Sequence, residues 1–248
     1  MDFFVSIPVF FISLIASFIG IIVSGSSLIV VPALAALGIP LATVIATNRL
    51  FVTVFVLVGA LSFARKKVKI DIKLVAGLAL VKIVGASSGS LFIISISPSQ
   101  LKPLVSLLVI AGLAAIFFFR NRKKTSTAIN KKHIALAVAA VFIIGIYDGM
   151  VGGGSGLVSR ALLMPIFGWT IIEATAADLA MSFFSSLASS LVFISSGAVD
   201  YALLLPMLAG GVFGAYAGTH FAVKADEKWV ERLFYAATIL LVANLILS

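Results

Sequence analysis

The sequence contains no cysteine, which excludes disulfide bonds, iron–sulfur clusters and thiol nucleophiles. Charged residues are also scarce: they make up 11% of the 248 residues, whereas a water-soluble domain carries about 25%. Apolar residues account for 62% of the chain, and its mean hydropathy is +1.24. So few charges cannot cover so much apolar surface in water. The composition therefore predicts an integral membrane protein whose solvent is lipid.

Histidine is nearly absent, and no pattern typical of a metal or catalytic site is visible. His133 and His220 are far apart in the sequence, and no group of His, Asp and Glu has metal-ligand spacing. The glycines at 152–156 lack the Lys-Ser/Thr pair that follows the glycines of a nucleotide-binding loop. We therefore predict no metal, no cofactor and no enzyme activity.

The formal charge of +9 comes mainly from two basic blocks, residues 65–73 and 120–132, each of which lies between apolar runs. A nucleic-acid-binding protein would gather such charge on one face. Here the pattern is that of the cytoplasmic loops of a multi-pass protein of the cell membrane. We predict no nucleic-acid partner. If every apolar run crosses the membrane once, both blocks follow an even number of crossings, and both termini are then expected to be cytoplasmic.

Eight apolar runs are long enough to cross a bilayer, which requires about 20 residues for ~30 Å of hydrocarbon. Six have the expected length: residues 41–64, 73–95, 101–119, 170–196, 201–223 and 229–247. The other two, residues 3–37 and 134–168, are longer and contain small residues midway, at 24–27 and 152–156. Each glycine weakens a helix by roughly 1 kcal/mol relative to alanine. We expect each long run to be a span and a half-length helix, joined by non-helical backbone.

The two halves of the chain align with an offset of about 129 to 130 residues. The two breaks fall on each other, and further matches follow in order: Gly38 with Gly168, Ala46 with Ala176, Asn48 with Asp178, Gly85 with Gly214 and Gly89 with Gly218. The predicted fold is an all-α integral membrane protein with about eight transmembrane helices in two related four-span repeats, each with one broken helix. The repeats are residues 1–120 and 134–248, and a basic cytoplasmic linker, 121–133, joins them.

The two breaks are the predicted substrate site. In transporters built from repeats, the substrate lies near mid-membrane, where broken helices meet. Unwound backbone is tolerated at that depth only where it is buried in protein or lines a wet cavity. The helix that follows each break presents its N-terminus there, which favours anions. The spaced glycines at 210–218 and 85–89 are instead interpreted as helix-packing positions.

Charged residues within spans cost at least ~2.5–3.5 kcal/mol each, so each one requires a reason. We predict that Arg49 and Arg160 attract an anion, because a guanidinium offers a planar fork of donors. Asp148 and Asp178 are predicted to carry a coupling proton or to balance the arginines. Lys82 is predicted to lie outside the site, with its long stem reaching polar surroundings. The other predicted substrate-binding residues are Ser24, Gly25, Ser26, Ser27, Asn48, Gly153, Gly154, Ser155 and Thr175.

The sequence also resembles a known family. Residues 20–32 (GIIVSGSSLIVVP), 37–40 (LGIP) and 46–49 (ATNR) resemble the first-half signature of the TauE/SafE sulfite exporter family, and YDGMVGGGSG at 147–156 resembles its second-half motif. The resemblance covers essentially the whole chain. It departs from the family at the serine-rich first break, at Leu179, where Lys is common, and at Ser182 and Ser186, where Asn is common.

The resemblance implies an ion-driven permease of the cytoplasmic membrane that exports a small anion, such as sulfite or an organosulfonate, with a coupling proton. A passive anion channel, and a membrane enzyme or assembly factor, remain open as alternatives. The predicted partners are the lipid bilayer and the small anion. The glycine-rich helix faces also leave a homo-oligomer open.

Overall fold

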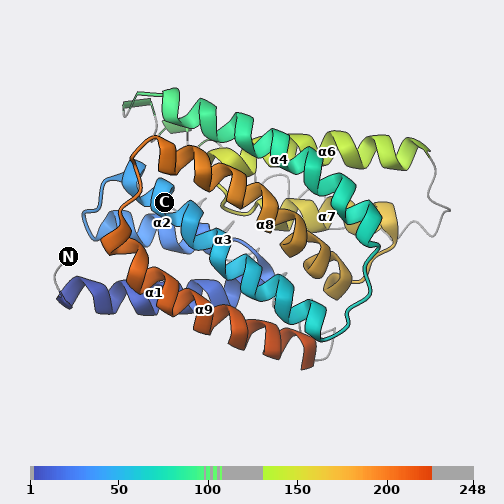
Figure 1. The fold of residues 1–248 in the computed structure, drawn as a ribbon, viewed down its shortest axis with the longest axis horizontal. Helices are drawn as coiled ribbons and strands as arrows, with labels where there is room; N and C mark the ends of the chain where they lie inside the picture. The colour runs from blue at the N-terminus through green and yellow to red at the C-terminus, as the bar shows by residue number, and fades with distance from the viewer. Residues whose placement is uncertain (1–2, 98, 101–102, 105–106, 108–130, 225–248) are drawn as a thin grey trace.

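The structure is a computed structural model that describes residues 3–97, 99–100, 103–104, 107 and 131–224. Its regular structure over these residues is helical, as predicted (Figure 1). The helices are α1 (Phe3–Val23), α2 (Ser26–Ala36), α3 (Leu41–Arg65), α4 (Ile72–Ser95), α6 (Lys131–Met150), α7 (Ser155–Phe167), α8 (Ile171–Ser195) and α9 (Tyr201–Lys224). The predicted spans at 101–119 and 229–247 and most of the linker 121–133 lie outside the described residues.

Six of these helices are long and apolar enough to cross a membrane: α1, α3, α4, α6, α8 and α9. Polar caps fix the ends of several of them. The Asp71 carboxylate accepts hydrogen bonds from the backbone N–H groups of Lys73 and Leu74 at the start of α4. Thr170 and Glu173 form a reciprocal capping box at the start of α8. These caps satisfy backbone donors that the first turn of a helix leaves without an intrahelical partner.

Both long apolar runs are broken, as the sequence predicts. The first break is Ser24 and Gly25, which have left-handed φ angles of 72° and 92° between α1 and α2. The second lies between Met150 and Ser155, where Gly152 and Gly154 are left-handed. Both breaks end sooner than predicted. Ser26, Ser27, Ser155 and Gly156 already belong to the first turns of α2 and α7, because small residues are compatible with the start of a helix.

Close packing at glycines shows the directions in which the helices run. Three glycines of α9 lie against successive turns of α1: Gly210 against Phe10, Gly214 against Leu14 and Gly218 against Phe18. On α4, Gly85 lies against Phe142 and Gly89 against Ile146, both on α6. The residue numbers rise together in both pairs, so α1 runs parallel to α9 and α4 runs parallel to α6. These contacts confirm that the spaced glycines are packing positions.

Helices α3 and α8 pack side by side at the centre and run in opposite directions (Figure 1). Thr53 contacts Ser190, while Gly59, farther along α3, lies against Leu179, nearer the start of α8. Helix α3 runs parallel to α9, and α8 runs parallel to α4. The helices α1, α2, α3 and α4 therefore correspond in order to α6, α7, α8 and α9. Each contacting pair of helices has a counterpart pair under this correspondence, and each helix runs in the direction opposite to that of its counterpart. This is the arrangement that an inverted repeat would give, and the division into repeats at 1–120 and 134–248 stays a prediction.

The helix directions bear on the orientation expected from charge. Since α1 and α3 both run parallel to α9, α2 must return toward the end of the bundle at which α1 begins. The run formed by α1 and α2 therefore doubles back, and it is not a single crossing. As a result, the N-terminal end of α1 and the basic segment 65–73 lie at opposite ends of the bundle (Figure 1). The expectation that they share one side assumed one crossing per run, and the structure differs in that respect.

Replacing Gly89 with alanine tests the glycine packing. A methyl group at Gly89 would collide with the backbone carbonyl of Ile146, so α4 and α6 must separate. We expect Gly89→Ala to lower stability by about 1–3 kcal/mol, measured as the thermal unfolding midpoint of the purified protein in detergent. Gly77→Ala is the matched control on α4, because nothing lies within 4 Å of its added methyl group. An unfolding midpoint for Gly89→Ala equal to that of Gly77→Ala would contradict the packing.

Candidate functional site

The two breaks, which are distant in sequence, meet inside the bundle. Gly25 of the first break lies near the backbone of Gly154 and the side chain of Leu157. A methyl group at Gly156 would collide with both the Ser24 hydroxyl and the Asp178 carboxylate. The N-terminal turns of α2 and α7 therefore face a common space, and each supplies backbone N–H groups without intrahelical partners.

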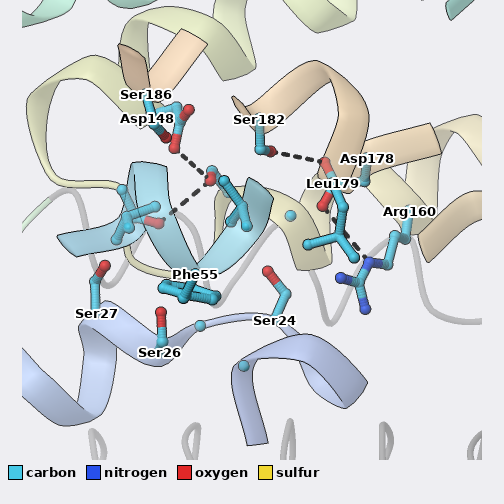
Figure 2. Close-up of a pocket in the computed structure, with 17 residues that line it drawn as sticks. Ser24, Ser26, Ser27, Phe55, Asp148, Arg160, Asp178, Leu179, Ser182 and Ser186 are labelled. Carbon is cyan, nitrogen blue, oxygen red and sulfur yellow. Dashed lines mark hydrogen bonds and ion pairs between the residues drawn. The ribbon is translucent and has the colours of Figure 1, made fainter. Parts of the chain in front are cut away.

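A cavity of about 30 Å³ lies at this meeting point (Figure 2). Eight of its lining residues belong to the predicted site: Ser24, Gly25, Ser26, Ser27, Asp148, Ser155, Arg160 and Asp178. One water molecule requires about 10–15 Å³ of such cavity volume, so the cavity has room for about two waters. A solute of several heavy atoms can enter only if the walls move. The walls also include apolar groups of α3 and α8, such as Phe55 and Leu179.

Five charged residues form one buried cluster beside the cavity. Arg49, Lys82, Arg160, Asp148 and Asp178 are each at most 3% exposed. Lys82 Nζ lies 3.4 Å from Asp178 Oδ1 and 3.9 Å from Asp148 Oδ2, so it connects the two carboxylates. Arg49 pairs with Asp148 at 3.4 Å, and Arg160 pairs with Asp178 at 3.6 Å. Three cations thus face two carboxylates, which leaves the cluster with a formal charge of +1.

The two carboxylates are held differently. Asp148 accepts short hydrogen bonds from the Ser155 hydroxyl at 2.7 Å and the Ser185 hydroxyl at 2.9 Å. Asp178 has no contact this short among the described residues. Its partners are the two cations at 3.4 and 3.6 Å and the Ser182 hydroxyl at 3.5 Å. Asp148 is therefore held firmly in place, and Asp178 is held loosely.

The two arginines bind the ends of the broken helices across the two halves. Arg49, on α3, donates to the backbone carbonyl of Asp148 in the last turn of α6, and its guanidinium packs against Gly152. Arg160, on α7, donates through Nη1 to the backbone carbonyl of Ile22 in the last turn of α1, at 3.0 Å. The C-terminus of a helix carries partial negative charge, so each arginine neutralises one end. The partly positive N-termini of α2 and α7 are left facing the cavity.

Five predicted residues do not line the cavity: Asn48, Arg49, Gly153, Gly154 and Thr175. Asn48 supports the site from behind, since its Nδ2 donates to the Ser27 hydroxyl at 2.9 Å. The Thr175 hydroxyl donates to the Ile171 carbonyl in its own helix. Gly153 accepts a hydrogen bond from the Tyr147 hydroxyl, which pins the second break. A direct role for these five residues in substrate binding stays a prediction.

Lys82, which was predicted to lie outside the substrate site, does not line the cavity, but it connects the two carboxylates of the charged cluster. It is 1% exposed, and its Nζ lies 2.7 Å from the Ser182 hydroxyl. Its position within a span signalled a role, but only the packing of α4 on α8 shows its partners. Ser182 and Ser186 of α8 also line the cavity. The signal for these two residues was their departure from the family pattern.

The charge balance predicts an order of stability for two variants. Lys82→Met leaves one arginine for each carboxylate, whereas Asp148→Asn leaves three cations with one carboxylate. Removing one partner of a buried pair costs about 3–5 kcal/mol when the other charge stays uncompensated. We expect Asp148→Asn to unfold at a clearly lower temperature in detergent than Lys82→Met. The reverse order would contradict the excess positive charge.

Comparisons with known proteins agree with this architecture. The family model for sulfite exporter TauE/SafE matches residues 9–245. The chain is 25% identical to a "Probable membrane transporter protein" of Haemophilus influenzae, with 90% of this chain and 87% of that protein aligned. It is 28% identical to "Probable membrane transporter protein ORF9" of a Sinorhizobium species, over 90% of this chain and 85% of the relative. It is 26% identical to "Probable membrane transporter protein YjnA" of Bacillus subtilis, over 89% and 91%. No solved structure matches. The chain belongs to the TauE/SafE sulfite exporter family of membrane transporters.

Proposed function

We propose that this protein is a secondary transporter that moves a small anion through the cavity between the N-termini of α2 and α7. The observation that carries the proposal is a set of buried donors without partners beside an excess positive charge. Among the described residues, Arg160 Nη2 and the Ser186 hydroxyl are buried without a hydrogen-bond partner, and both residues line the cavity. Buried polar groups nearly always have partners, so these donors suit a ligand that brings acceptors.

An oxyanion fits this set of donors. A guanidinium binds the oxygens of a planar or tetrahedral anion through parallel N–H groups. The serine hydroxyls and the first-turn amides of α2 and α7 would bind further oxygens. We propose a sulfur-containing anion, sulfite or an organosulfonate, as the substrate. The support is the donor set together with membership of a family named for sulfite export.

We further propose that transport is coupled to a proton, because two carboxylates, Asp148 and Asp178, share the cluster with the cations. An outward direction is proposed from membership of a family named for sulfite export. A passive channel requires a continuous aqueous path, and a cavity with room for about two waters does not supply one in this conformation. The doubled-back runs and their shared cavity favour alternating access, in which the two repeats rock around a fixed site.

Flux into proteoliposomes tests the substrate and the role of Arg160. Purified protein should take up radiolabelled sulfite faster than empty liposomes, and a pH gradient should change the rate. Arg160→Gln should reduce uptake by about tenfold or more, since a charge-assisted donor to the anion is lost. Arg65→Gln is the matched control, because Arg65 is exposed at the end of α3, and it should transport like the wild type.

Wild-type rates in Arg160→Gln, at equal expression, would overturn the anion site. Sulfonates, sulfate and carboxylates offered as competitors would rank the substrates. If a carboxylate competed better than every sulfur anion, the substrate assignment would be wrong while the anion site stood.

Orientation follows from the basic segment after α3. We propose that residues 65–73 face the cytoplasm of a cell whose cytoplasmic membrane holds the protein. Because α1 and α3 run in the same direction, this orientation places the N-terminal end of α1 on the opposite side. The expected cytoplasmic N-terminus is therefore incompatible with a cytoplasmic 65–73 segment.

Cysteine labelling tests this orientation in a chain that has no cysteine of its own. Lys69 and Ser196 are both exposed. They lie at opposite ends of the bundle, because the loop after Ser196 contacts Thr47 near the start of α3. In intact cells, a membrane-impermeant maleimide should label Ser196→Cys and should label Lys69→Cys only after the cells are opened. The reverse pattern would invert the orientation.

A further inference from the structure

The two buried carboxylates of the cluster have different capacities to change their charge. Asp148 is tied to α7 and α8 by two short hydroxyl hydrogen bonds, and Arg49 contacts both its side chain and its backbone carbonyl. Four contacts of this carboxylate, one each with α3, α4, α7 and α8, would be weakened if it were neutralised. The negative charge of Asp148 therefore helps to hold the packed helices together.

Asp178 is held by two cations and one serine hydroxyl, all at long distances that leave it free to give up its partners. Lys82 Nζ lies at 3.4 Å and Arg160 Nε at 3.6 Å, and Nε makes no hydrogen bond. Each cation also has another oxygen at a shorter distance: Ser182 at 2.7 Å from Lys82 and the Ile22 carbonyl at 3.0 Å from Arg160. Loss of the charge on Asp178 would leave both cations with these anchors.

We infer that Asp178, and not Asp148, is the carboxylate whose protonation is coupled to anion binding at Arg160. The inference rests on the proposed transport function and adds the residue that carries the proton. A proton taken from water on one side binds an Oδ atom of Asp178 and removes the negative charge that faces Arg160. The Nε and Nη2 atoms of Arg160 are then free for the anion. Release of the anion lets Asp178 return its proton to water on the other side and pair with Arg160 again.

The surroundings of Asp178 support this exchange. Among the described residues, the charged groups that face it are Lys82 from α4 and Arg160 from α7, with Asp148 of α6 beyond Lys82. Arg49 of α3 pairs with Asp148, and the break between α1 and α2 contributes the uncharged Ser24, whose hydroxyl lies near the Asp178 carboxylate. Asp178 also lines the cavity (Figure 2). An anion bound at Arg160 would therefore compete with Asp178 directly.

Two transport assays on the same liposomes separate coupling from binding. One measures net uptake of radiolabelled sulfite driven by a pH gradient, and the other measures sulfite exchange with equal pH and equal sulfite on both sides. We expect the gradient-driven uptake of Asp178→Asn to be about tenfold lower than that of the wild type, which is the size of a typical coupling between two binding events. Its exchange should stay within about twofold to threefold of the wild type and should no longer depend on pH, because the neutral amide mimics the protonated carboxyl group.

Two carboxylate controls accompany this variant. Asp148→Asn should keep its ratio of gradient-driven uptake to exchange, although it should unfold at a lower temperature than Asp178→Asn. Asp71→Asn should behave like the wild type, because Asp71 is the exposed cap of α4 and asparagine caps helices about as well as aspartate.

Each outcome is decisive. Wild-type gradient dependence in Asp178→Asn, or its loss in Asp148→Asn instead, would overturn this inference and leave the transport function standing. Failure of the wild type to exchange sulfite, sulfonates, sulfate or carboxylates would overturn the transport function as well. If Asp178→Asn does not fold, Asp178→Glu keeps a carboxyl group one methylene away. A pH profile of exchange that is shifted in this variant would support the inference, and an unchanged profile would contradict it.

Discussion

The constraint on which the structure depends is the neutralisation of broken helix ends inside a membrane. Each break exposes carbonyl groups at the end of one helix and N–H groups at the start of the next, and lipid can satisfy neither. An arginine from the opposite half binds the carbonyl end in each case: Arg49 at the end of α6, and Arg160 at the end of α1. The carbonyl ends are thus satisfied by protein, and the N–H ends face the cavity. The two halves are also tied together by the same contacts.

This arrangement of buried charges is unfavourable for stability alone. Well-packed apolar residues often stabilise a protein as much as buried ion pairs do, or more. A cluster of three cations and two carboxylates, with a cavity beside it and donors left without partners, is instead consistent with the proposed anion site. Part of the cluster stands on tightly packed helices, since Lys82 lies on α4 and Asp148 on α6. Glycines bring α1 against α9 and α4 against α6 so closely that backbone touches backbone. In these two tight pairs, α9 packs against α3 and α4 packs against α8.

Much of this could be predicted from the sequence, because it follows from local composition. Hydropathy and run length give the six long helices, and the glycines Gly25, Gly152 and Gly154 give the breaks, since glycine adopts left-handed backbone readily and weakens a helix. Pairing of buried arginines with buried carboxylates was also expected, because isolated charges are too costly in a bilayer.

Other features depend on contacts between distant segments, and no local pattern records them. Lys82 has apolar neighbours in sequence, and its partners on α6 and α8 appear only when α4 packs against both helices. The doubled-back course of the first run follows from α1 and α3 both running parallel to α9, whereas the length of the run alone suggested one crossing. Thr175 was predicted to bind the substrate, but its hydroxyl turns back to its own helix. Spacing locates a residue on a helix and does not orient its side chain.

The most direct measurement is the position of a bound anion. Selenite has the shape and charge of sulfite, and its selenium can be located by anomalous scattering in crystals of the full-length protein. The selenium should lie beside Arg160, between the N-terminal turns of α2 and α7. A selenium found only at the exposed basic residues of 65–73, with the space beside Arg160 empty at saturating selenite, would contradict an anion site between the two broken helices.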